Sequence, residues 1–146
     1  MVGKVGEKEL YMETRLLLVD DDEAFREAFA RMLQLALAPE LNVSFAQADS
    51  LAEAHTLLKQ EEDGLDAALI DIGLPDGDGL DLVRELNGHG ERITSLPMLV
   101  RTANLEHSVA ARAIEAGARG ALSKVVSMRE TAEAVQRLIG AGRSAG

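Results

Sequence analysis

Length, composition and charge narrow the classes to which this chain can belong. Its 146 residues fit one domain of roughly 100–150 residues, and the 47% share of hydrophobic residues is enough for a core. With 15 Lys and Arg against 25 Asp and Glu, the net charge of −10 argues against direct binding to nucleic acid. The chain has no Cys for disulfides or thiolate metal sites, no run of roughly 20 apolar residues for a membrane span, and no pattern of a secretion signal. We therefore expect a soluble, cytoplasmic domain without membrane contact.

A buried strand and an amphipathic helix are predicted first along the chain. Residues 1–13 are polar and without period, and we interpret them as a flexible leader. The apolar run over 16–19 stops at Asp20, which is typical of a strand buried on both faces. Apolar residues then recur at helical spacing until Pro39. The predicted buried stripe of this helix is Phe25, Ala28, Phe29, Met32, Leu33 and Ala36.

The same alternation of strand and helix continues to the end of the chain. Ser50 with Glu53, and Ser127 with Glu130, have the spacing of capping boxes and predict two helix starts. The last of these helices is expected to run to Ile139. Short apolar runs predict strands over 42–48, 67–70, 98–100 and 120–122, and further helices are predicted over 80–86 and from 109 to a stop at Gly117.

Five strand–helix units predict an α/β fold with one parallel sheet. Connections between parallel strands are right-handed and place helices on both faces of the sheet. We expect a five-stranded parallel sheet in the flavodoxin-like order 2-1-3-4-5, in which ligands bind at the carboxyl ends of strands one and three. The predicted domain covers residues 14–140, and the Gly/Ala/Ser-rich residues 141–146 form a flexible tail or the start of a linker.

Carboxylates gather at the predicted ligand-binding edge of the sheet. Asp20 and Asp21 leave the first strand, Asp71 leaves the third, and Thr102 and Lys124 follow the fourth and fifth. Two carboxylates 4 Å apart repel by about 4 kcal/mol at an effective dielectric of 20, and a bound hard cation would remove this repulsion. Without His or Cys in the cluster, the oxygen ligands favour Mg²⁺. An Asp beside such a cation can accept a phosphoryl group, whereas a simpler interpretation as helix caps fits neighbouring acids such as Asp22 and Glu23.

These motifs resemble those of the receiver domain of two-component response regulators. The resemblance covers about residues 15–139, and the part after Lys124 is most similar to receivers of LuxR-type regulators. The matching segments are Leu17-Leu18-Val19-Asp20-Asp21, Leu69 to Gly79 around Asp71, Thr102-Ala103, and Gly117 to Lys124.

The resemblance implies a role for each residue of the cluster. Asp71 would be the phosphoacceptor, and Asp21, Asp71 and the backbone carbonyl of Gly73 would bind Mg²⁺ directly, with Asp20 partly through water. The phosphoryl group would be bound by Thr102, Ala103 and Lys124. The donor would be a histidine kinase or a phosphotransfer protein, and a downstream protein or an output domain would receive the signal.

Several positions depart from the family pattern, among them Ala121 and Arg101. Ala121 stands where the family usually places an aromatic switch residue, so the coupled motion of Thr102 with that aromatic is in question. Arg101 replaces an apolar residue. We expect its side chain to extend along the end of the sheet toward solvent, and the alternative is a contact that biases the site.

Three other functions compete with a phosphorylated switch. A Mg²⁺-dependent hydrolase would need a substrate pocket or cap, and the sequence has no inserted segment long enough to build one. A pseudo-receiver that does not accept phosphate, and a receiver fragment of a DNA-binding transcription regulator, remain open. The last helices could also support a homodimer.

Overall fold

The computed structural model describes residues 13–61, 64–87 and 96–145, and it contains the predicted parallel sheet. Its strand order is β2-β1-β3-β6-β7, and every neighbouring pair is parallel. Counted along the chain without the short β4 and β5, this is the order 2-1-3-4-5, so the predicted flavodoxin-like fold is confirmed. The strands are β1 (Glu13–Val19), β2 (Asn42–Ala48), β3 (Ala67–Asp71), β6 (Met98–Thr102) and β7 (Gly120–Ser123).

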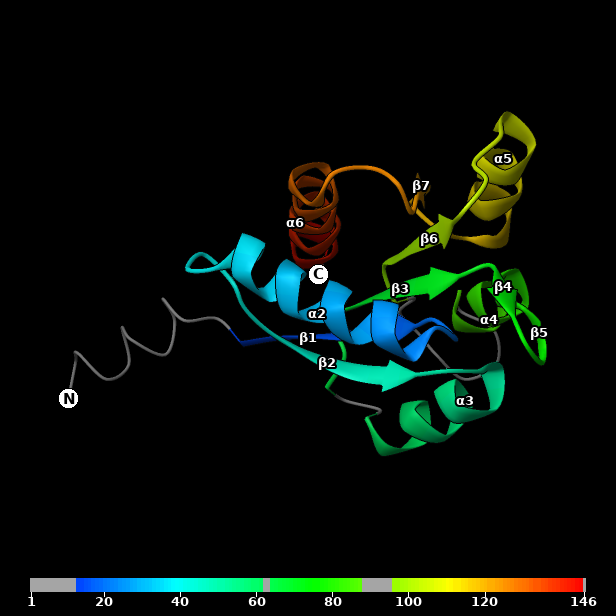
Figure 1. Ribbon diagram of the computed structural model, residues 1–146, viewed down its shortest axis with the longest axis horizontal. Coiled ribbons are helices and arrows are strands. Elements are labelled where there is room, and N and C mark those ends of the chain that lie inside the picture. Colours follow the sequence, from blue (N-terminus) through cyan, green and yellow to red (C-terminus); the bar gives the residue numbers. More distant parts are fainter. Residues whose placement is uncertain (1–12, 62–63, 88–95, 146) are drawn as a thin grey trace.

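Helices cover both faces of the sheet, as Figure 1 shows. The pair on one face is α2 (Glu23–Leu37) and α6 (Met128–Ala145), and the other face carries α3 (Leu51–Gln60), α4 (Gly79–Leu86) and α5 (His107–Ala116). No helix among the described residues combines the length and the apolar character that crossing a membrane requires.

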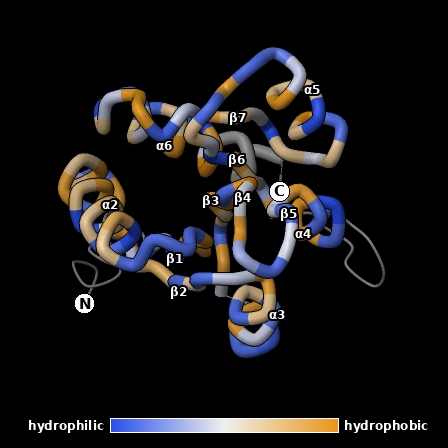
Figure 2. The backbone as a smooth tube through the Cα atoms, turned by 45° about the vertical axis from the view of Figure 1, so that its right-hand side comes forward, coloured by the Kyte–Doolittle hydropathy of each residue, from blue (hydrophilic) through white to orange (hydrophobic). Residues whose placement is uncertain are grey.

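The period of two along a strand divides the core into two apolar layers. Leu16 and Leu18 are fully buried against α2 and α6, whereas Leu17 and Val19 pack into the layer under α3, α4 and α5. Figure 2 shows apolar segments in the interior, near β3, and mixed polar and apolar colouring along the surrounding helices. The first strand is therefore apolar at successive positions because both of its faces are buried.

The buried stripe of α2 differs from the predicted one. The residues of this helix that are buried are Arg26, Phe29, Ala30, Leu33 and Leu37. Phe25 and Met32 are 37% and 53% exposed, so the prediction that Met32 belongs to the core is wrong. A search for apolar residues alone passes over the buried Arg26 and starts the stripe one position too early. Phe25 and Met32 instead line a cavity of about 270 Å³ that extends to Met128 on α6.

The end of α6 also differs from the prediction. This helix runs to Ala145, beyond the expected end at Ile139, and so includes residues of the predicted Gly/Ala/Ser tail. The start of α5 is near the expected one, and its end is as predicted: Gly117 has φ +120 and donates its N–H to the carbonyls of Ala113 and Ile114. Only a residue without Cβ adopts such a φ freely, which explains why the helix stops there.

The predicted loop over 73–79 contains a small ribbon that fixes the residues after Asp71. Its two antiparallel strands are β4 (Gly73–Leu74) and β5 (Gly77–Asp78). Between them, the Asp76 carboxylate accepts hydrogen bonds of 2.9 and 3.0 Å from the backbone N–H groups of Leu51 and Ala52 at the start of α3. These bonds lower the pKa of Asp76 and tie the loop to the neighbouring helix.

Candidate functional site

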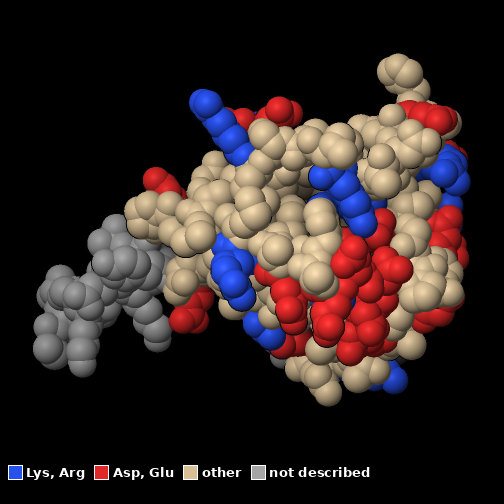
Figure 3. All heavy atoms as spheres, viewed as in Figure 1, with Lys and Arg blue, Asp and Glu red and all other residues tan. Residues whose placement is uncertain are grey.

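The structure brings together the three predicted aspartates at the carboxyl ends of β1 and β3. One ligand oxygen from each of Asp20, Asp21 and Asp71 lies within 4.8 Å of the other two. Asp20 is completely buried and Asp71 is 6% exposed, whereas Asp21 faces solvent. On the face that Figure 3 shows, Asp and Glu atoms gather in one region with Lys or Arg atoms at its border. Such an acidic region favours the approach of a cation.

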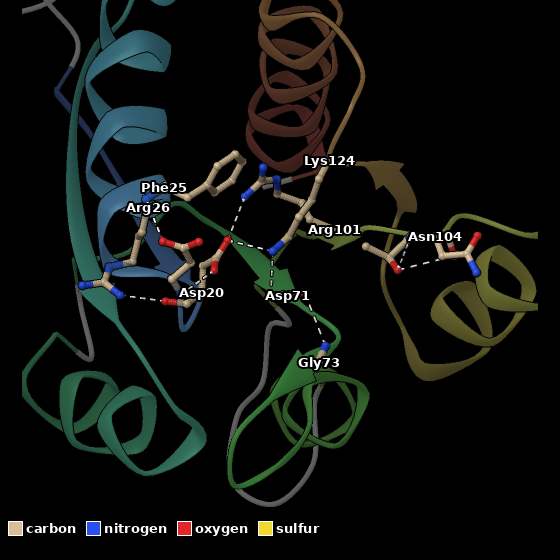
Figure 4. A network of polar contacts seen from close by, with 10 residues as sticks. Asp20, Phe25, Arg26, Asp71, Gly73, Arg101, Asn104 and Lys124 are labelled. Carbon is tan, nitrogen blue, oxygen red and sulfur yellow. Dashed lines mark hydrogen bonds and ion pairs between the residues drawn. The ribbon is translucent and has the colours of Figure 1, made fainter.

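Lys124 joins the two buried carboxylates from the end of β7. Its Nζ lies 3.0 Å from Oδ2 of Asp20 and 2.8 Å from Oδ2 of Asp71, as the dashed lines of Figure 4 show. Burial alone would lower the pKa of Lys124, but the hydrogen bonds to the two carboxylates outweigh burial and raise this pKa. The lysine is therefore charged, and it already neutralises part of the repulsion between Asp20 and Asp71.

Asp71 occupies a desolvated position at the centre of this group. Burial raises the pKa of its carboxyl group, while the hydrogen bond and charge of Lys124 and the 3.3 Å hydrogen bond from the Gly73 N–H act in the opposite direction. A buried carboxylate that has lost water contacts and faces an ammonium group is typical of a functional site rather than of a surface helix cap.

Arg101 is part of this group, although it does not belong to any of the sequence motifs that the chain shares with the family. Its side chain is 3% exposed, so the interpretation that it extends toward solvent is wrong. The guanidinium carbon lies 3.8 Å from the ring centroid of Phe29 and 5.2 Å from that of Phe25. Its Nη1 lies 3.6 Å from Oδ2 of Asp20, which fulfils the alternative expectation of a contact with the site.

Arg26 is a member of the site that the sequence did not reveal. From α2, its Nη1 donates a 2.7 Å hydrogen bond to the backbone carbonyl of Asp20, and its Nε donates one of 3.0 Å to Oε1 of Gln47. Arg26 therefore holds the backbone of the first aspartate in place. In the sequence, the one indication that Arg26 is buried is its position on the same helix face as apolar residues.

The predicted phosphoryl-binding residues do not all contact Asp71. The hydroxyl of Thr102 accepts a 3.2 Å hydrogen bond from the backbone N–H of Asn104, so it is engaged with the loop after β6. Ala103 is exposed, and Ala121 is half-buried and packs against the core under α3, α4 and α5. Of the basic and hydroxyl residues predicted for the phosphoryl group, Lys124 alone reaches the aspartates within the described structure.

The chemistry of the donor set fits Mg²⁺. Asp20, Asp21 and Asp71 offer carboxylate oxygens, and hard cations such as Mg²⁺ prefer oxygen ligands with some retained water. The exposed Asp21 leaves the site open to solvent, which suits a cation that keeps part of its hydration shell. The residues present can therefore hold the ion that the sequence predicted.

Comparison with known proteins agrees with this geometry. The family model of the response regulator receiver domain matches residues 16–136. The chain is 36% identical over 130 residues to the DNA-binding transcriptional activator DevR/DosR of Mycobacterium tuberculosis, covering 89% of this chain and 56% of that protein. It is 31% identical over 119 residues to the transcriptional regulatory protein KdpE of Staphylococcus aureus, covering 82% and 47%.

A solved structure with a similar fold is that of a LuxR-family two-component response regulator from Aurantimonas sp.. It has a TM-score of 0.75 and 25% sequence identity, and the match covers 88% of this chain and 86% of that one. The chain spans about half the length of the two regulators named above, at 56% and 47%. The acidic pocket of Asp20, Asp21 and Asp71 fits the phosphoacceptor site of phosphorylatable receivers. The chain belongs to the response regulator receiver domain family.

Proposed function

We propose that Asp71 is the phosphoacceptor of this receiver domain and that the reaction requires Mg²⁺. Receiver domains of response regulators are signalling proteins, and we interpret this one as a switch rather than a turnover enzyme. The observation that carries the proposal is the position of Asp71: its buried carboxylate lies beside two other aspartates and 2.8 Å from the Lys124 ammonium.

The residues around Asp71 divide the work of phosphoryl transfer. A carboxylate oxygen of Asp71 attacks phosphorus, the bond between phosphorus and the donor breaks, and the leaving group keeps the electron pair. Mg²⁺, held by Asp20, Asp21, Asp71 and the Gly73 carbonyl, would offset the negative charge on the phosphoryl oxygens. Lys124 supplies a second positive charge from the carboxyl end of β7, already within hydrogen-bond distance of the acceptor.

The switch would operate through the strand ends next to Asp71. Once Asp71 carries a phosphoryl group, Lys124 would contact the phosphoryl oxygens in place of the Asp71 carboxylate. The Thr102 hydroxyl and the Ala103 N–H can bind the same phosphoryl group. To do so, Thr102 must leave its contact with Asn104. Because Ala121 lacks an aromatic ring, the movement would affect the face of α5 and α6 without the coupled rotation of an aromatic side chain.

The partners follow from the same proposal. The phosphoryl donor would be a histidine kinase or a phosphotransfer protein, and the receiver of the signal would be a downstream protein or an output domain. Since the relatives of about twice this length include transcriptional regulators, a DNA-binding output domain is one candidate. The division into a leader, a domain over 14–140 and a tail, the cytoplasmic location and the homodimer stay predictions.

A phosphoryl adduct detected by intact mass would test this function. We expect the wild type to gain one phosphoryl group from a small phosphodonor in the presence of Mg²⁺, and Asp71→Asn to gain none. A folded wild type that never forms the adduct, with either a small donor or a phosphorylated histidine protein, would instead identify a pseudo-receiver.

A further inference from the structure

Arg101 brings a second buried positive charge to the phosphoacceptor site. Within the described residues, its Nη1 is a buried donor without a hydrogen bond, and its nearest carboxylate oxygen is Oδ2 of Asp20 at 3.6 Å. That oxygen is the same one that Lys124 contacts at 3.0 Å. Asp20 therefore faces two cations before any metal ion binds.

The aromatic residues of α2 hold the guanidinium in this position. Phe25 and Phe29 have their ring centroids 6.1 Å apart and nearly parallel planes, and Arg101 lies over both rings. Cation–π contacts of this kind stabilise a desolvated guanidinium. An arginine also stays protonated at neutral pH, even though burial lowers the pKa of Arg101 from its ordinary value.

This fixed charge acts in opposite directions on the two groups that the site must bind. A guanidinium 3.6 Å from the Asp20 carboxylate repels a metal cation that this carboxylate binds, whereas a phosphoryl group is an anion and is attracted. Burial of the guanidinium strengthens both effects, because electrostatic interactions are stronger at the low effective dielectric of a protein interior. The charge of Lys124 likewise repels a metal cation and attracts a phosphoryl group. Lys124, however, also makes direct hydrogen bonds to both aspartates, while the Nη1 of Arg101 makes none.

We propose that Arg101 is a positioning residue that weakens Mg²⁺ binding to the unphosphorylated domain and strengthens binding of the phosphoryl anion. This inference rests on the proposed function of Asp71. Arg101 would raise the Mg²⁺ concentration that the domain needs before Asp71 can accept a phosphoryl group. It would also add a charge-assisted contact once the phosphoryl group is present.

Titration of the domain with Mg²⁺ alone tests the first half of this proposal. Isothermal titration calorimetry would compare the wild type with Arg101→Met, which keeps an apolar chain of similar length and removes the charge. We expect Mg²⁺ to bind Arg101→Met about tenfold more tightly or better, since a tenfold change corresponds to a modest difference in interaction free energy. Arg101→Lys should remain near the wild type, because the charge is kept.

A matched control separates this local effect from the change in net charge. Arg112→Met removes the same charge from an exposed position on α5, and its Mg²⁺ affinity should equal that of the wild type. Circular dichroism and thermal unfolding of each variant check the fold. If Arg101→Met fails to fold, Arg101→Gln, which keeps a polar side chain, must give the same tighter binding.

Beryllium fluoride, an anionic mimic of the phosphoryl group, tests the second half. At Mg²⁺ concentrations that saturate each variant, we expect Arg101→Met to bind it about tenfold more weakly than the wild type. An unchanged or weaker Mg²⁺ affinity in Arg101→Met, or unchanged beryllium fluoride affinity, would overturn the proposal. The Mg²⁺ titration involves no phosphoryl donor, so it gives its answer whether or not Asp71 is the acceptor.

Discussion

The Lys124 ammonium lies 2.8 Å from the Asp71 carboxylate, and this contact connects the ends of two strands that are not neighbours in the sheet. It joins β7 to β3 across β6, so the acceptor and its counter-charge come from segments 53 residues apart. The same ammonium also contacts Asp20 at the end of β1. One side chain thus connects the two buried aspartates of the acidic cluster.

Loss of Lys124 should destabilise the domain in the absence of metal. Lys124→Met leaves Asp20 and Asp71 without their shared partner; leaving a buried polar group unsatisfied costs about 1–3 kcal/mol, and a charged group costs more. We expect urea unfolding in EDTA to show a loss of this size, and Mg²⁺ to restore part of it. The exposed Lys59→Met is the control and should unfold like the wild type. Equal stability of Lys124→Met and the wild type in EDTA would contradict this role.

The raised pKa of Asp71 predicts how the stability of the domain depends on pH. The folded state holds the Asp71 proton to a higher pH than the unfolded chain does, so ionisation of this group costs stability as the pH rises through the raised pKa. This cost is absent below the ordinary Asp pKa of about 3.9.

Asp71→Asn removes that cost, so its stability relative to the wild type should increase from acid to neutral pH. Chemical unfolding in EDTA at several pH values measures the difference. Asp49→Asn, which makes the same substitution at an exposed carboxylate, is the control. A difference between Asp71→Asn and the wild type that stays constant with pH, or shrinks as the pH rises, would show that ionised Asp71 is not disfavoured in the fold.

Gly79 lies so close to the acceptor that no side chain fits there. A Cβ at this position would overlap the backbone carbonyl oxygen of Asp71, and the Gly79 N–H donates a 2.7 Å hydrogen bond to the carbonyl of Ile72. We expect Gly79→Ala to displace the end of β3 and to destabilise the domain by about 1–3 kcal/mol.

Gly140→Ala is the matched control, because a Cβ there meets nothing within 4 Å. On α6 this change should be neutral or stabilising by up to about 1 kcal/mol, since Ala is the better helix former. Comparison of the two variants by thermal unfolding, together with the phosphoryl adduct of each, separates close approach at Asp71 from the general effect of adding a methyl group. A fully stable Gly79→Ala would show that the loop can move away from Asp71.

The strands and the acidic cluster could be predicted because their signals are local. Runs such as Leu16–Val19 are apolar at every position only when both faces of a strand are buried, and the runs of β1 and β3 end directly before Asp20 and Asp71. Once the sheet order is set, the ends of parallel strands meet at one edge, so Asp20, Asp21, Asp71 and Lys124 come together.

The rest of the site depends on packing between distant segments. The burial of Arg101 requires the rings of Phe25 and Phe29 on α2, and the residues next to Arg101 in the sequence do not indicate this contact. Arg26 and Asp76 likewise contact backbone groups whose positions only the folded chain defines. The stripe of α2 was predicted one position too early for the same reason, because a buried arginine looks like a surface residue in a hydropathy pattern.

The most direct test of the central claim is the mass of the intact protein after incubation with a small phosphodonor. Wild type and Asp71→Asn would be compared with Mg²⁺ and with EDTA, and the position of the adduct would be mapped by peptide analysis. We predict one phosphoryl group on Asp71, in the wild type and only with Mg²⁺. A phosphoryl adduct on folded Asp71→Asn, or one that forms equally well in EDTA, would contradict the assignment.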